Sequence, residues 1–345
     1  MRTRISGFIP AYRSTRQVRY RSAATQQEPS MSDPFARIDP GTLRPRLDAT
    51  LASALASGAL QPIATREAVV MDEGVAFRVR QVDSLARKES ERRRAAHPDA
   101  KRPRPANPFL PPEPGLTVGA LSDTHVAVLN KFNVLALHLL VVTRRFEHQE
   151  TLLTPADMEA LARCLNEMDG LAFYNGGTLA GASQPHKHLQ LVPLPLADGG
   201  PALPMEPRLL GEGAGPPPFH HALVRLDQTR TSPDLDPAAL HQRYLDLLGR
   251  IGIHPLGRDG ATWQSGPYNL LVTRRWMLAV PRRCECVDGI SVNALGFAGS
   301  LFVRDASGLA AIRRRGPMAV LCETAGLADP WGPTAPSDSR AGAAG

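Results

Sequence analysis

The sequence predicts an α+β protein of two domains, in which helices pack beside antiparallel strands. The length of 345 residues suits two domains, because one domain typically takes about 150 residues. Several short segments alternate apolar and polar residues with the two-residue period of a strand, and each half also carries a well-marked helix. We expect the domains at residues 40–195 and 219–328. Between them, the Pro/Gly-rich segment 196–218 is a linker or a long surface loop. An extension at 1–30 and a disordered tail at 329–345 flank the domains.

In the first half, helices and strands follow one another closely. Leucines at helical spacing predict a leading helix over 43–64, and the alternation over 75–82 predicts a strand. Thr154 before Pro155, with Asp157 in the first turn, is typical of a helix start. The strands that we expect here lie at 69–70, 75–82, 125–130, 138–143, 171–174 and 186–194.

The second half repeats the mixture of one helix with several strands. Apolar residues at Leu240, Tyr244 and Leu247 fall on one face of a helix expected over 236–251. Residues 306–326 read as a closing helix. The strands that we expect in this half lie at 219–226, 269–273, 276–280 and 301–303.

The charge of the chain is concentrated at its beginning. Lys and Arg total 40 against 33 Asp and Glu, a net charge of +7, yet residues 1–30 alone hold six arginines and one acid. The remainder is nearly neutral, so the basic pI says little about binding partners. Two interpretations of residues 1–30 stay open: a transit peptide, or a start codon assigned too far upstream. We expect a cytoplasmic protein, or an organellar one if the extension is a real transit peptide.

Two other classes of protein are excluded by the pattern of residues. The best apolar run, 134–142, is interrupted by His138 and is much shorter than the ~18–20 residues of a membrane-spanning helix, so we expect a soluble protein without membrane contact. Four scattered cysteines make no disulfide framework or zinc knuckle. A basic run at 87–104 carries no interleaved aromatic residues, so it indicates a solvated loop and does not favour nucleic-acid binding.

The most informative stretch reads Gly-Ala-Ser-Gln-Pro-His-Lys-His-Leu-Gln over residues 181–190. Alternate residues of a strand share a face, so we expect His186, His188 and Gln190 to project together. The small residues before them suit a loop whose backbone N–H groups approach a phosphate closely. A neutral imidazole beside such a loop is suited to attack phosphorus and to carry a nucleotidyl group to a second acceptor.

Two simpler interpretations compete with this one. A His-x-His pair also occurs in metal sites, but no third ligand lies nearby in the sequence, so we expect no metal. Solvated histidines on a strand are common, and only the adjoining loop and Gln190 favour catalysis.

The same stretch resembles the signature of the diadenosine tetraphosphate phosphorylases, also called ATP adenylyltransferases, of the histidine-triad and galactose-1-phosphate uridylyltransferase superfamily. Further similarity lies at 129–143, around Tyr268, Trp276 and Pro281, and at 291–304, and in total it covers roughly residues 40–328. The resemblance implies a histidine-triad-like antiparallel sheet in the catalytic domain and a smaller C-terminal α+β domain.

The resemblance also implies roles for individual residues. His188 matches the nucleophile that becomes adenylylated, His186 supports it, and Gln190 contacts the phosphate. Arg304 stands where the family commonly has lysine, and Glu89 follows Lys88 where the family often has proline. The substrate-binding positions of the family fall here on Lys88, Asn130, Lys131, Asn175, Gly181, Ala182, Ser183, Gln184, Gln190, Asn293, Ala294, Leu295, Ser300 and Arg304.

The implied reaction is reversible phosphorolysis of diadenosine tetraphosphate with phosphate to ATP and ADP, through an adenylyl group on His188. The covalent step needs no cofactor, although a divalent cation such as Mg²⁺ could accompany the polyphosphate. Two alternatives remain open: a dinucleoside polyphosphate hydrolase, which uses water in place of phosphate, and a non-catalytic nucleotide- or nucleic-acid-binding protein.

Overall fold

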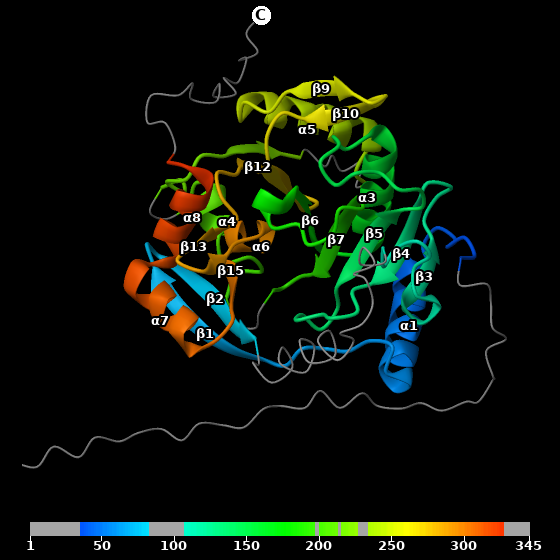
Figure 1. Cartoon of the computed structure of the whole chain (residues 1–345), viewed down its shortest axis with the longest axis horizontal. Coiled ribbons are helices and arrows are strands. Elements are labelled where there is room, and N and C mark those ends of the chain that lie inside the picture. The colour runs from blue at the N-terminus through cyan, green and yellow to red at the C-terminus, as the bar shows by residue number, and fades with distance from the viewer. Residues whose placement is uncertain (1–34, 83–106, 197–199, 213–214, 227–233, 328–345) are drawn as a thin grey trace, which may run out of the picture. The chain divides into compact units, whose positions relative to one another are not determined.

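An antiparallel sheet of eight strands forms the centre of the protein (Figure 1). The computed structural model describes residues 35–82, 107–196, 200–212, 215–226 and 234–327. The expected extension at 1–30, Lys88 and the tail from 329 onward lie outside the described residues. The strands follow in space as β3 (Thr117–Ala120), β4 (His125–Leu129), β5 (Leu139–Thr143), β7 (His188–Pro193), β6 (Gly170–Gly176), β11 (Tyr268–Val272), β12 (Trp276–Pro281) and β8 (Ala222–Arg225).

The sheet runs without a break through both expected domains. Strand β6 of the first half pairs with β11 of the second, with Asn175 opposite Asn269. The predicted α+β class and antiparallel sheet are therefore confirmed, and strands of both halves join in this one sheet. The described part of residues 196–218 includes the short helix α4 (Glu206–Leu209) and two fully buried side chains, Leu203 and Met205.

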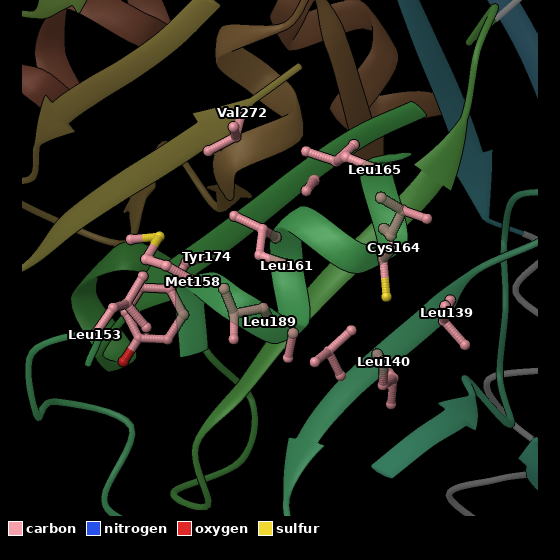
Figure 2. Packing of buried hydrophobic residues seen from close by; sticks show 14 of the residues in the cluster. Leu139, Leu140, Leu153, Met158, Leu161, Cys164, Leu165, Tyr174, Leu189 and Val272 are labelled. Carbon is pink, nitrogen blue, oxygen red and sulfur yellow. The ribbon is translucent and has the colours of Figure 1, made fainter. Parts of the chain in front are cut away.

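One face of the sheet is covered by three helices, α1 (Leu43–Ser57), α3 (Pro155–Glu167) and α5 (Pro237–Arg250). Figure 2 shows Met158, Leu161 and Leu165 of α3 lying over this sheet, together with Tyr174 of β6 and Leu189 of β7. Because strand residues alternate between faces, Leu189 and Leu191 pack under the helices while His188 and Gln190 project to the opposite face.

The opposite face packs against elements from both ends of the chain. Strands β1 (Thr65–Asp72) and β2 (Val75–Val82) form a hairpin, and β15 (Ser300–Val303) adds to β2 in parallel. Figure 1 shows the blue hairpin of β1 and β2 beside β15 and the orange C-terminal helices. Its neighbours are the helices α6 (Ala294–Phe297), α7 (Ala306–Arg315) and α8 (Pro317–Ala325). Their apolar side chains pack with Leu171, Phe173 and Trp276 of the large sheet.

The helix starts are fixed by the local signals in the sequence. The Thr154 side chain accepts from the Asp157 backbone N–H, and Asp157 accepts in return from the Thr154 N–H, which is a complete capping box. The single closing helix expected at 306–326 is wrong. It divides into α7 and α8 because Gly316 adopts φ +86° and Pro317 begins a new helix.

Several elements carry no clear pattern in the sequence. The edge strand β3 of the large sheet and two small hairpins are additions to the expected elements. The hairpins consist of β9 (Pro255–Arg258) with β10 (Ala261–Gln264), and β13 (Cys286–Val287) with β14 (Ile290–Ser291). Among the described residues, no helix has both the length and the apolar character needed to cross a membrane.

Candidate active site

A cavity of about 1170 Å³ opens between the second face of the large sheet and the segment from β13 to α7. The strands β4, β5, β6 and β7 supply its floor, and the residues around Asn293 and Arg304 supply the facing wall. It brings together most of the predicted site residues, which are Asn130, Lys131, Asn175, Gly181, Ser183, Gln184, His188, Gln190, Asn293, Leu295 and Arg304.

Four predicted residues do not line this cavity. Ser300 is fully buried and accepts a hydrogen bond from Arg80 Nη1 at 2.6 Å, so it joins β15 to β2. Ala294 contributes its backbone N–H behind Asn175. Ala182 and His186 are likewise not among the lining residues, and Lys88 lies outside the described residues.

His188 is held as a neutral imidazole with one nitrogen available. Its Nδ1 lies 2.8 Å from the backbone carbonyl of His186. A carbonyl only accepts, so Nδ1 carries the proton and Nε2 keeps its lone pair. Gln149 fixes the strand at this point, because its Oε1 accepts from the His188 N–H at 2.9 Å. His188 therefore presents a nucleophilic nitrogen at the cavity wall.

His186 lies two residues before His188 and is fully buried, and its backbone carbonyl orients the His188 ring. Of the three residues expected on one face, His188 and Gln190 lie on β7 and line the cavity, whereas His186 precedes the strand and is not among the lining residues. The His186 Nε2 donates to the Thr143 carbonyl at 2.8 Å, and its Nδ1 accepts from Asn107 at 2.9 Å. Phe109 contacts both rings, with centroids 5.6 Å from His186 and 5.4 Å from His188. These contacts fix the carbonyl that orients His188.

A second imidazole, His138, orients the amide of Gln190. Asn130 Nδ2 donates to His138 Nδ1 at 3.1 Å, so the proton of His138 sits on Nε2 and is donated to Gln190 Oε1 at 2.8 Å. The Nε2 amide group of Gln190 is thereby left to donate to a ligand. Sequence reasoning placed His138 only in a strand, because the pairing of β5 with β7 that aligns it with Gln190 is a tertiary feature.

Burial keeps both cavity histidines uncharged. It lowers the pKa of His188 from 6.5 to about 4, against a smaller opposing effect of the His186 carbonyl. Burial likewise lowers the pKa of His138 to about 4, although its hydrogen bond to Gln190 favours the charged form. Removing an imidazolium from water is costly, so both rings are neutral at pH 7.

The loop before His188 lies directly against the second half of the chain. Gly181 adopts φ +91°, and a Cβ at this position would come within 2.9 Å of the Asn293 Cβ. Only glycine meets both the conformation and the contact. The close approach sets the exposed hydroxyl of Ser183 and the side chain of Gln184 at the edge of the cavity.

Basic side chains lie at both ends of the cavity. Lys131 pairs with Glu113 at 2.7 Å, and both line the cavity with partial exposure. Arg304 and Arg314 lie on the wall formed by β15 and α7. The cavity thus offers positive charge and amide donors around a neutral imidazole, which suits a polyanion such as a polyphosphate.

Lys187, between the two histidines, points into the other face of the sheet. It is fully buried, with Nζ 2.7 Å from Glu147 and 3.4 Å from Asp157, and Asp157 also accepts from His125 at 2.9 Å. This charged network ties the strand of His188 to the start of α3. In the part of the chain that the structure describes, no group of three or more His, Cys, Asp or Glu side chains is arranged to hold a metal ion.

Comparison with known proteins agrees with this geometry. Residues 33–211 match the family model described as the Ap4A phosphorylase N-terminal domain, where Ap4A is diadenosine tetraphosphate, and residues 216–326 match the ATP adenylyltransferase C-terminal domain. The two models divide the chain inside the 196–218 segment, although the sheet is continuous there.

Two curated relatives and a solved structure from yeast are similar to this chain. The chain is 27% identical to Protein APA1 of Saccharomyces cerevisiae over 59% of its length and 70% of that protein. It is 28% identical to diadenosine 5',5'''-P1,P4-tetraphosphate phosphorylase 2 of the same organism over 61% of its length and 74% of that protein. The crystal structure of yeast Ap4A phosphorylase Apa2 in complex with AMP has the same fold, with a TM-score of 0.67, 22% identity, and coverage of 85% of this chain and 99% of that chain. The match to the first family model spans more than half of the sequence, so this chain belongs to the Ap4A phosphorylase family.

Proposed function

We propose that the protein is a nucleotidyltransferase that catalyses the reversible phosphorolysis of diadenosine tetraphosphate to ATP and ADP. The observation that carries the proposal is the neutral His188, whose Nδ1 proton is held by the His186 carbonyl while the ring lines the cavity. Membership of the Ap4A phosphorylase family supplies the substrate class. Yeast Apa2, which shares the fold, has been solved in complex with Ap4A.

In the first half-reaction, His188 Nε2 attacks one terminal adenylyl phosphorus. A P–N bond forms, the bond to the bridging oxygen breaks, and its electron pair leaves with ATP. The imidazole becomes positively charged as it transfers its lone pair, and the His186 carbonyl stabilises that charge through Nδ1–H. ATP is a weakly basic leaving group, so no strong general acid is required.

In the second half-reaction, an oxygen of inorganic phosphate attacks the same phosphorus. The P–N bond breaks, its electron pair returns to His188, and ADP is released. The Gln190 Nε2 amide, the loop from Gly181 to Gln184 and the basic groups at Lys131 and Arg304 are the donors in this proposal. Such fixed donors stabilise the charge on the phosphoryl oxygens in the transition state.

The covalent step needs no cofactor in this proposal, because imidazole itself is the nucleophile. A Mg²⁺ ion that enters with the polyphosphate would neutralise part of its charge. The partners proposed are small nucleotides and phosphate, and neither a membrane nor a nucleic acid takes part.

The identity of the acceptor distinguishes transfer from hydrolysis. With diadenosine tetraphosphate, we expect turnover to require phosphate and to yield ATP and ADP in equal amounts, as measured by ion-exchange chromatography of the products. AMP released at the same rate with and without phosphate would show that water is the acceptor. Tight nucleotide binding without any turnover would favour the non-catalytic alternative.

The pH dependence of the first half-reaction reports the buried state of His188. Because burial lowers its pKa to about 4, the ring is neutral throughout pH 6–8, and we expect the rate of adenylylation to be constant there. The rate should fall only as the pH approaches 4, where protonation removes the lone pair. Rapid-quench measurement of the protein adduct isolates this step from the titration of phosphate. A midpoint near 6.5 would mean that His188 is solvated during the reaction.

A further inference from the structure

Arg282, which directly follows β12, is a buried guanidinium held by neutral oxygens. The residue is 5% exposed. Nη1 donates to Asn269 Oδ1 at 2.7 Å and to the Val292 carbonyl at 2.8 Å, and Nη2 donates to the Cys284 carbonyl at 2.7 Å. Burial lowers the pKa of Arg282 to about 10, so the side chain is charged at pH 7. Among the described residues no carboxylate forms an ion pair with Arg282, although Glu285 is near enough to favour the charged form. A buried charge without such a pair is costly, which calls for a reason beyond packing.

Asn269 links Arg282 to Asn175, which lines the cavity. It is fully buried on β11, and its Nδ2 donates to Asn175 Oδ1 and to the Ala180 carbonyl, both at 2.8 Å. The orientation of the Asn269 amide is fixed, because Arg282 is purely a donor and must face the oxygen. Asn269 therefore must present its N–H groups to Asn175.

Asn175 is the residue of this series that lines the cavity. Its Oδ1 accepts from Asn269 and also from the Ala294 backbone N–H at 3.0 Å. Two donors on the same oxygen fix the amide plane, so the donor group Nδ2 is the end left to meet a ligand. These hydrogen bonds join the segments matched by the two family models. Asn175 lies in the first segment, and Asn269 and Arg282 lie in the second.

We propose that Arg282 and Asn269 are positioning residues that hold the Asn175 amide with its Nδ2 donor directed at a phosphate or ribose oxygen of the bound nucleotide. The charge of Arg282 polarises the Asn269 amide, which in turn polarises the Asn175 amide, so the terminal N–H is a stronger donor than an isolated amide. The substrate is that of the proposed function, on which this inference rests. Arg282 also fixes Val292, next to Asn293 of the cavity wall.

The sharpest variant is Asn269→Asp, which keeps the shape of the side chain. The new carboxylate pairs with Arg282 but has no proton for Asn175 Oδ1. The Asn175 oxygen then either faces the carboxylate or turns away and sets Nδ2 against the Ala294 N–H, so in both orientations the fixed Nδ2 donor is lost. We expect the Kd for AMP, measured by titration calorimetry, to rise about 10-fold to 100-fold, the range for losing a hydrogen bond to a charged group. The value of kcat/KM for Ap4A phosphorolysis should fall by a similar factor.

A double-mutant cycle distinguishes positioning from a general structural role. In an Asn175→Ala background, Asn269→Asp should change AMP affinity and kcat/KM by less than about threefold, because the group through which it acts is gone. Asn166→Asp is the matched control: its amide makes two hydrogen bonds to Leu235 beneath a different surface, and both readouts should stay at the wild-type level. If Asn269→Asp does not fold, Asn269→Ser is tested in the same cycle.

Two results would overturn the proposal. In the first, an Asn269 variant binds AMP as tightly as the wild type while Asn175→Ala binds it weakly. In the second, the fold-losses of the two single substitutions multiply in the double variant. If neither the wild type nor Asn166→Asp turns over Ap4A, the proposed function fails. The positioning role is then tested by AMP affinity alone.

Discussion

His188→Ala is expected to abolish the nucleotidyl adduct and to lower the turnover of diadenosine tetraphosphate by ~10⁴-fold or more, as for removal of other catalytic nucleophiles. The neighbouring His186 cannot substitute for it, because both of its ring nitrogens are engaged by Thr143 and Asn107. Intact-protein mass spectrometry after mixing with substrate in the absence of phosphate measures the adduct directly. We expect a mass increase of one AMP on the wild type, which phosphate removes as ADP appears.

The matched control for this experiment is His254→Ala. His254 is an exposed histidine before β9 and does not belong to the cavity lining, so its removal should leave both adduct and turnover unchanged. An adduct of equal yield on His188→Ala would place the nucleophile elsewhere. A wild-type protein that turns over without any adduct would indicate direct transfer between the two nucleotides.

Local signals in the sequence are sufficient to predict most of the fold. The start of α3 is predictable because Thr154, Pro155 and Asp157 satisfy the helix end with groups only three residues apart. The strands β4 and β5 are predictable because their apolar residues are contiguous. The continuity of the sheet is not, since it depends on β6 meeting β11 nearly 100 residues later, and neither strand encodes its partner.

The same distinction holds for the active site. The stretch from Gly181 to Gln190 is one contiguous segment, so its chemistry can be predicted from the order of its residues alone. His138 and Asn269 escape prediction as functional residues because their partners, Gln190 and Asn175, are distant in sequence. Arg282 escapes it because it acts only through Asn269. Ser300 is expected in the substrate site on the strength of the resemblance, yet here it bonds to Arg80 inside the small sheet.

Gln190→Glu is expected to lower kcat/KM for phosphorolysis by about 10²-fold to 10³-fold, the usual cost of losing one fixed donor to a transition-state oxyanion. The substitution preserves the shape and the acceptor that receives the His138 N–H. It replaces the amide donor by a carboxylate oxygen, which repels the phosphoryl oxygens instead of binding them. Steady-state kinetics with diadenosine tetraphosphate at saturating phosphate measures the effect.

The comparison of Gln190→Glu with Gln190→Ala separates repulsion from loss of the donor. Alanine removes the donor without adding charge, so its loss of kcat/KM should be smaller than that of glutamate. Gln61→Glu controls for the added charge. Gln61 is exposed and its side chain bonds locally, to Gly58, so this substitution should leave kcat/KM unchanged. A Gln190→Glu protein that keeps its activity within threefold would mean that this amide does not face the reacting phosphate. The His138 contact would then serve the packing of β5 against β7 alone, and the donors to the phosphoryl oxygens would have to come from the loop at Gly181 and from the basic residues of the facing wall.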